Sequence, residues 1–276
     1  MKRLALLLVL ITGALLIYGS LYFPDWADPQ SPASQHVSPY YIEQTFNDTA
    51  LPNIVSAVLA DYRSYDTMFE TAVIFAAGLA CFFLLRTFKS ESAKTRMYRH
   101  LPTRLVIHVD THEKRLDLND NFERMDTQWT PYDLITRTTC RIIIPFIQIF
   151  ALYVIAHGHH SPGGGFQGGV IFGASVILFA LSHSLRSTIK RLPEKSSALY
   201  ASIGVFIFAG TGMLCLILGA DFLDYYVLAD LFRSSHAMAR SHGILVVEIG
   251  VGLSVLAVMI WLYYNLSSGG KHKEGL

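Results

Sequence analysis

Long runs of apolar residues dominate this chain, and shorter polar segments separate them. At a helical rise of about 1.5 Å per residue, a run of about 20 apolar residues spans a hydrocarbon core about 30 Å thick. An amphipathic stretch at 52–65 precedes the second long run. The pattern predicts an all-α integral membrane protein with six transmembrane helices, at roughly 4–23, 68–85, 140–156, 163–185, 198–218 and 244–264.

The composition supports membrane insertion and excludes several classes of site. Hydrophobic residues make up 52% of the 276 residues and charged residues 16%, whereas soluble domains carry about 25% charged residues. The net charge of +1 says nothing about nucleic-acid or acidic partners, and we expect no nucleic-acid partner for a membrane protein of this kind. The three cysteines lie in or beside apolar runs without metal-ligand spacing, so we interpret them as small apolar side chains that pack on helix faces. Phosphate-binding loops, dinucleotide fingerprints and haem or iron–sulfur spacings are absent from the sequence, and we expect neither a cofactor nor an autonomous enzyme.

The distribution of basic residues predicts the orientation. If both termini lie inside, the inner segments hold 19 of the 22 Lys and Arg residues, as the positive-inside rule requires. The first run, behind Lys2 and Arg3, could instead be a cleaved signal peptide, but it is long for one and 19–23 makes a poor cleavage site. We therefore expect it to remain as a helix. The polar stretch at 86–139 then lies inside as a linker or a small surface-lying element, with one short strand at 106–109 and the rest charged and irregular.

The most unusual segment is a turn at 157–169 that is rich in glycine and histidine. We expect Pro162 to begin the fourth helix, where its missing N–H is harmless. Glycines then recur at every fourth position and form a stripe that lets membrane helices approach closely. We interpret the small residues of this segment chiefly as helix-packing positions: Pro162, Gly163, Gly164, Gly165, Gly168, Gly169 and Gly173.

The histidines of this turn have several possible roles. No carboxylate or cysteine accompanies His157, His159 and His160 at ligand spacing, which argues against a metal site. They could titrate near neutral pH at the mouth of a proton or cation route, or simply lie in a solvated loop. The sequence leaves both interpretations open.

Ionisable residues stand inside or beside the apolar runs, where they are expensive and usually face a partner or a wet cavity. Asp61, Arg63, Asp66 and Glu70 enter the second run; Asp66 and Glu70 share a helix face, and Arg63 could neutralise Asp66. They form either a polar cap in water or a buried ion-handling cluster, in which Glu70 is the best candidate because only apolar residues follow it. Glu248 lies within the last run, either buried against another subunit or extended toward the membrane interface.

These residues resemble a known family. Residues 133–137, Pro145, Tyr153 and the turn at 157–169 resemble the B subunit of Mrp-type multisubunit cation/proton antiporters, the MnhB-like domain, and residues 248–252 are similar to its last helix. The stretch 52–70 is similar to the C-terminal membrane part of the A subunit, which resembles the E subunit of membrane-bound hydrogenases. Ser64 and Phe69 stand where that pattern has glycines.

The resemblance implies an E-type membrane unit at 1–90, a polar cytoplasmic linker at 91–129 and a four-helix MnhB-like domain at 130–276. It implies a multi-pass subunit of a bacterial or archaeal cell membrane, both termini cytoplasmic, that is not itself catalytic. Its partners would be the lipid bilayer, other antiporter subunits, and protons exchanged for Na⁺ or another monovalent cation. The candidates for an ion or proton path are Glu70, Asp66, Arg63, Asp61, Glu248, His157 and His159.

Two alternatives remain at this stage. The chain could be the equivalent membrane subunit of an energy-converting, hydrogenase-like oxidoreductase, since only the partner subunits would differ. It could also be a purely structural subunit that docks its neighbours through the glycine stripe.

Overall fold

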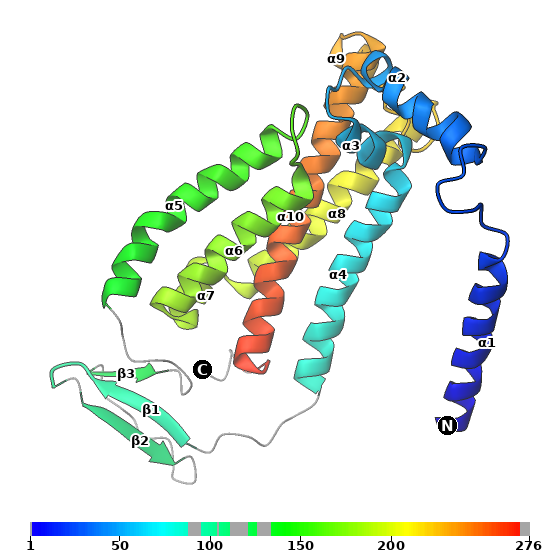
Figure 1. Ribbon diagram of the computed structural model, residues 1–276. Helices are drawn as coiled ribbons and strands as arrows, with labels where there is room; N and C mark the ends of the chain where they lie inside the picture. Colours follow the sequence, from blue (N-terminus) through cyan, green and yellow to red (C-terminus); the bar gives the residue numbers. More distant parts are fainter. Residues whose placement is uncertain (1, 88–94, 104, 111–120, 126–133, 271–276) are drawn as a thin grey trace. The chain divides into compact units, whose positions relative to one another are not determined.

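The computed structural model describes residues 2–87, 95–103, 105–110, 121–125 and 134–270 (Figure 1). They fall into two compact units, residues 1–45 and 46–276. In the first unit, the apolar helix α1 (Lys2–Ser20) is followed by a loop, the π-helix η1 (Ala33–Val37) and most of α2 (Ser38–Thr49). Asp28 closes that loop, since its carboxylate accepts a hydrogen bond from the Gln30 backbone N–H at 2.8 Å.

The second unit begins with a broken helix. Asn53 caps α3 (Ile54–Ala57) by accepting a hydrogen bond from the Val55 N–H, and the π-helix η2 (Val58–Tyr62) follows directly. Arg63 leaves helical geometry at φ −126° and ψ 36°, and α4 (Ser64–Thr87) starts at the next residue. The polar groups at 61–66 therefore stand at the junction of two helical pieces.

A bundle of helices completes this unit, with its longest helix at the centre. Helix α10 packs against α8, α6 and α4, while α5 packs against α6. The core around α10 is built from large apolar side chains such as Phe208, Tyr225, Ile244 and Val247. The helices are α5 (Leu134–Ala156), α6 (Gly165–His183), α7 (Leu185–Arg191), α8 (Glu194–Ile217), the 3-10 helix η3 (Tyr225–Val227), α9 (Leu228–Phe232) and α10 (His236–Ser268).

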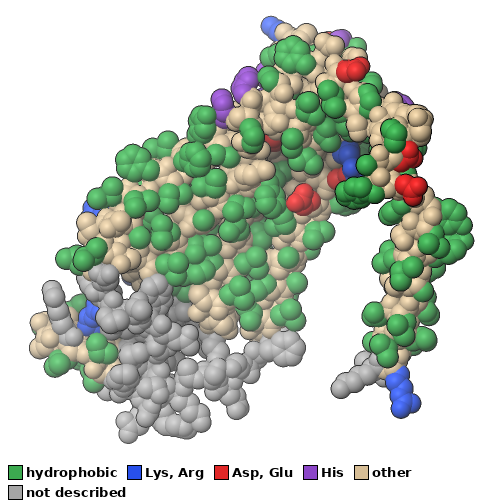
Figure 2. Space-filling model, in the orientation of Figure 1, with side chains coloured by type: hydrophobic (Ala, Val, Ile, Leu, Met, Phe, Trp, Pro, Cys, Tyr) green, Lys and Arg blue, Asp and Glu red, His purple; other side chains and the backbone are tan. Residues whose placement is uncertain are grey.

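The expected membrane architecture is confirmed. Among the described residues, six helices are long and apolar enough to cross a membrane: α1, α4, α5, α6, α8 and α10. Hydrophobic side chains cover the visible flanks of the bundle (Figure 2). Helices α5 and α10 begin furthest ahead of their apolar runs, at Leu134 and His236, because polar residues such as Arg137 and Arg240 continue the helix beyond the apolar stretch. Helices α4 and α8 also begin about one turn early. This is a multi-pass membrane protein.

The polar stretch between α4 and α5 contains a small sheet. Strand β1 (Thr95–His100) pairs antiparallel with β2 (Val106–Asp110) and with β3 (Phe122–Met125), in the order β2-β1-β3. The expected strand at 106–109 lies within β2. The expectation that the rest of this stretch is irregular was wrong, because β1 and β3 carry no alternating apolar pattern and form by pairing with their neighbours.

Candidate functional site

A cavity of about 180 Å³ lies between the broken helix, the glycine-rich turn and α10. Helix α10 enters the bundle at this end, which we call the turn end after residues 157–164. Histidine side chains gather there in Figure 2. The cavity has a mainly apolar wall, and its polar lining comes from Ser56, Thr67, Glu70, Thr71, Gln167 and Glu248. Two of the predicted ion-path carboxylates therefore face one cavity, although they lie far apart in the sequence.

Glu248 is buried within this chain. The residue is 8% exposed, so it neither waits for another subunit to bury it nor extends to the membrane interface. Its Oε2 has no hydrogen-bond partner among the described residues, and neither has the Nε2 of His159. These two atoms are 3.9 Å apart, which is too long for a hydrogen bond. A buried carboxylate left unsatisfied beside a cavity is unusual and calls for a functional reason.

The glycine-rich turn closes over this carboxylate. A side chain at Gly164, which has φ +122°, would place its Cβ 2.9 Å from the Oε1 of Glu248. A Cβ at Gly165 would lie 1.9 Å from the backbone oxygen of Glu248, and one at Gly169 would lie 2.6 Å from that of Gly252. The turn and the start of α6 thus touch the backbone of α10 directly, as close packing of glycines allows.

The other small residues of the turn face α5 or α10. A Cβ at Gly163 would lie 2.8 Å from the Val154 oxygen, and one at Gly168 would lie 2.2 Å from a side-chain carbon of Ile155, while Gly173 faces Met259. Pro162 does not begin the fourth helix, contrary to our prediction. The non-helical φ of Gly164 delays the helix to Gly165, so Pro162 lies in the turn.

The broken helix is tied to this turn by hydrogen bonds. The Asn53 side chain donates to the backbone oxygens of Gly158 at 2.7 Å and Ser161 at 2.8 Å, and its backbone N–H donates to that of His159 at 3.1 Å. The hydroxyl of Ser56 donates to Gly158 at 2.9 Å. Sequence reasoning missed both residues, although an asparagine directly before a helix is a recognisable N-cap signal.

The four charges of the broken helix are divided between buried and exposed positions. Asp61 is buried and forms an ion pair with Arg240 of α10, whose Nε lies 3.2 Å from its Oδ1. Burial raises the pKa of Asp61 above its ordinary value, although the Arg240 guanidinium opposes this. Arg63 and Asp66 pair at 2.5 Å on the exposed surface, as their spacing suggested. Glu70 alone among the four lines the cavity, from an exposed position on α4.

The histidines of the turn differ in their surroundings. Burial lowers the pKa of His159, and the nearby His160 and His242 add to that effect. His157 stacks on Tyr153 with ring centroids 4.9 Å apart and does not line the cavity. Within the described residues, no group of three or more His, Cys, Asp or Glu side chains is arranged to hold a metal ion.

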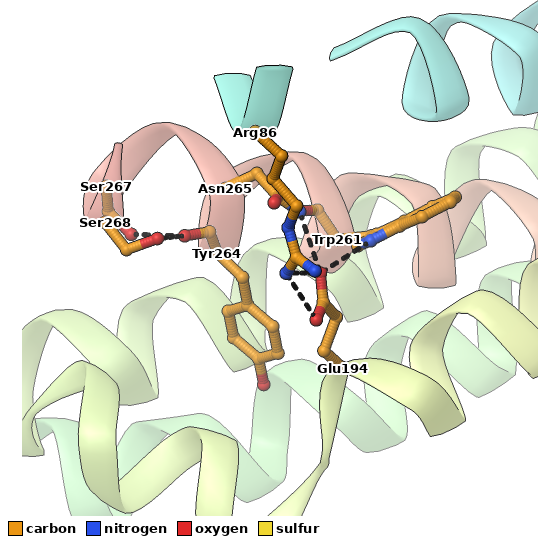
Figure 3. A network of polar contacts seen from close by, with 7 residues as sticks. All are labelled: Arg86, Glu194, Trp261, Tyr264, Asn265, Ser267 and Ser268. Atoms are coloured by element: carbon orange, nitrogen blue, oxygen red, sulfur yellow. Dashed lines mark hydrogen bonds and ion pairs between the residues drawn. The ribbon is translucent and has the colours of Figure 1, made fainter. Parts of the chain in front are cut away.

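A second polar cluster joins three helices at the opposite end of the bundle, which we call the linker end because α4 ends and α5 begins there. Arg86 of α4 donates to both carboxylate oxygens of Glu194 at 2.7 Å (Figure 3). Trp261 Nε1 at 3.1 Å and Asn265 Nδ2 at 3.3 Å, both from α10, also donate to Glu194. No pattern along the chain indicated this cluster, since its members lie far apart and flank the apolar runs.

Comparison with known proteins identifies both halves of the chain. Residues 135–261 match the family described as a domain related to the MnhB subunit of Na⁺/H⁺ antiporters. Residues 7–100 match the family described as the E subunit of MBH. The putative antiporter protein mnhB2 of Staphylococcus haemolyticus is 31% identical over 140 residues, which cover 50% of this chain and 96% of that protein. Its counterpart in Staphylococcus aureus strain Newman is 29% identical over the same length.

Solved structures share the fold across nearly the whole chain. A chain of the Mrp complex from Dietzia sp. DQ12-45-1b aligns with a TM-score of 0.59 and 21% identity, over 96% of this chain but only 26% of that larger chain. A chain of the membrane-bound sulfane sulfur reductase, an archaeal respiratory membrane complex, aligns with a TM-score of 0.54 and 24% identity, over 94% of this chain and 97% of that one. The resemblance seen in the sequence is confirmed, and the chain belongs to the MnhB-related family of Na⁺/H⁺ antiporter subunits.

Proposed function

We propose that this chain is a non-catalytic membrane subunit of a multisubunit Mrp-type antiporter, and that the cavity between Glu70 and Glu248 belongs to its proton or cation path. The observation that carries the proposal is the buried Glu248 carboxylate, whose Oε2 has no partner among the described residues and which faces a cavity that Glu70 also lines. A carboxylate in such a place can take up a proton or a monovalent cation and release it again, because no fixed partner within the described residues competes for Oε2.

The arrangement around the cavity supports this role. Asn53 and Ser56 hold the glycine-rich turn against the broken helix, so the cavity wall is rigid on that side. Glu70 is exposed on α4, where an adjoining subunit of the complex would cover it. Glu248 then forms the inner end of a route whose outer part is completed by the assembly.

The experiment replaces each carboxylate by its neutral isostere in the assembled complex. Glu248→Gln and Glu70→Gln should each reduce cation-dependent proton movement in membrane vesicles to near background, with unchanged subunit composition. Asp66→Asn is the matched control, because Asp66 pairs with Arg63 on the surface and does not line the cavity. Normal transport by both glutamine variants would exclude the cavity from the path.

An equivalent subunit of an ion-coupled oxidoreductase is the second candidate. The matched chain of the sulfane sulfur reductase has nearly the same extent as this one, since 97% of it is covered. Purification of the intact complex separates the two possibilities: iron–sulfur subunits among the partners support the oxidoreductase, and antiporter subunits alone support the antiporter.

A purely structural subunit makes the opposite prediction. In that case the glutamine variants of Glu70 and Glu248 transport normally. Gly169→Leu does not separate the two hypotheses, because Gly169 packs against the Gly252 backbone of α10 within this chain and a leucine there disturbs its own bundle in either case.

A further inference from the structure

A second cavity, of about 320 Å³, lies at the linker end between α5, α6 and α7. Arg141 and Arg191 line it together with Gln148, and its apolar wall includes Ile144, Val176 and Phe179. It shares no lining residue with the cavity at Glu248. Nothing in the proposed transport function uses this second cavity, which we call the basic groove.

The polar and apolar groups of the basic groove are arranged in a gradient. Arg141 lies early in α5, and Arg191 ends α7, so both guanidiniums belong to the linker end. Gln148 lies further along α5, and Val176 and Phe179 lie one to two turns before α6 ends at His183. The groove is thus cationic at the linker end, and beyond the arginines its lining is apolar apart from Gln148.

The positive charge of the basic groove is concentrated. The guanidiniums of Arg141 on α5 and Arg191 on α7 line the same cavity. The Arg191 guanidinium rests 4.6 Å above the ring of Phe179. In the part of the chain that the structure describes, no carboxylate forms an ion pair with Arg141 or Arg191. The groove therefore suits an anionic occupant.

We propose that the basic groove binds an anionic phospholipid, with the phosphate headgroup held by Arg141 and Arg191 and an acyl chain lying along Ile144, Val176 and Phe179. Basic pockets between transmembrane helices at a membrane surface are suited to such headgroups. Two guanidiniums beside an apolar wall match a phospholipid, in which an anionic phosphate is attached to acyl chains. The bound lipid would join α5 to α7 across the groove.

The test uses the intact complex and dioleoyl-phosphatidylglycerol as the probe. Titration should show saturable binding and a raised midpoint of thermal unfolding. The double variant R141Q/R191Q should weaken binding about 25-fold, because each basic residue near the surface contributes about fivefold. Lys190→Gln is the matched control, since Lys190 is exposed on α7 and does not line the groove.

A second variant keeps the test valid if R141Q/R191Q fails to fold, and two other ligands test for other occupants of the basic groove. Val176→Trp, which fills the apolar part and keeps both arginines, should also reduce lipid binding. Dioleoyl-phosphatidylcholine should raise the midpoint of thermal unfolding less than dioleoyl-phosphatidylglycerol does, and inorganic phosphate should not raise it. The proposal is overturned if inorganic phosphate raises the unfolding midpoint as much as the lipid does, or if R141Q/R191Q binds the lipid as tightly as the wild type. It is also overturned if a photo-cross-linker at Gln148 captures a protein subunit instead of lipid.

Discussion

Two buried glutamates lie at opposite ends of the same bundle, and their surroundings differ sharply. Glu194 at the linker end is 9% exposed and accepts hydrogen bonds from Arg86, Trp261 and Asn265. Glu248 at the turn end is 8% exposed, yet its Oε2 has no partner among the described residues and faces a cavity. In our proposal, the same degree of burial serves two purposes. Glu194 is hydrogen-bonded from two other helices and fixes three helices together, whereas Glu248 keeps one oxygen with which to bind a proton or cation.

The largest effect on stability is expected from the satisfied glutamate. Glu194→Ala leaves the half-buried Arg86 guanidinium without its carboxylate and removes the acceptor of Trp261 and Asn265, so the free energy of unfolding should fall by about 3–5 kcal/mol. Glu248→Gln, by contrast, should change it by less than about 1 kcal/mol, because it removes a charge that had no partner on Oε2 among the described residues. Denaturation of the detergent-solubilised chain measures both. If Glu248→Gln proves less stable than Glu194→Ala, the hydrogen bonds of Glu194 do not stabilise the bundle more than Glu248 does.

The next effect concerns the backbone contact that buries Glu248. Gly165→Ala places a methyl group 1.9 Å from the Glu248 carbonyl oxygen, so the helices must separate, and we expect a loss of about 2–3 kcal/mol. Gly210→Ala on α8 is the matched control, because the nearest atom to its Cβ would be 3.8 Å away. That control should be neutral or slightly stabilising. Equal stability of the two variants would show that the close approach at Gly165 does not limit how these helices pack.

A smaller effect separates the two aspartates of the broken helix. Asp61→Asn removes the buried partner of Arg240 and should destabilise the chain by about 1–3 kcal/mol. Asp66→Asn breaks an exposed pair with Arg63 and should cost at most about 0.5 kcal/mol. Thermal unfolding of the two variants under one set of conditions provides the measurement. Equal midpoints would show that the Asp61–Arg240 pair is not the anchor that its burial implies.

The smallest effect is a pH dependence at the turn end. Burial lowers the pKa of His159 below its ordinary value of 6.5, so the folded chain binds fewer protons there than the unfolded chain. The contribution of His159 to the free energy of unfolding is therefore complete above about pH 6.5, where the ring is neutral in both states, and it declines as the pH falls below 6.5. His159→Gln should flatten this decline in a series of unfolding measurements from neutral to mildly acidic pH. A stability that rises on acidification would show that the Glu248 charge dominates instead.

Much of the fold and part of the site could be predicted without the structure. The six helices followed from the apolar runs, but several of their ends did not, since residues such as Arg137 and Arg240 carry a helix past the apolar stretch. Glu70 and Glu248 were chosen because charge inside an apolar run is rare. The predicted helix start at Pro162 was wrong because the backbone of Gly164 depends on the turn packing against Glu248.

The sequence by itself determined the membrane class, the six helices and the family, because a hydrocarbon core demands about 20 apolar residues per helix whatever the helices pack against. Only the tertiary structure decided which charges are paired. Asp61 meets Arg240 and Arg86 meets Glu194 across the bundle, while Glu248 meets the glycine-rich turn and keeps an oxygen without a partner among the described residues. Such partnerships depend on how distant helices pack, and no local pattern along the chain encodes them.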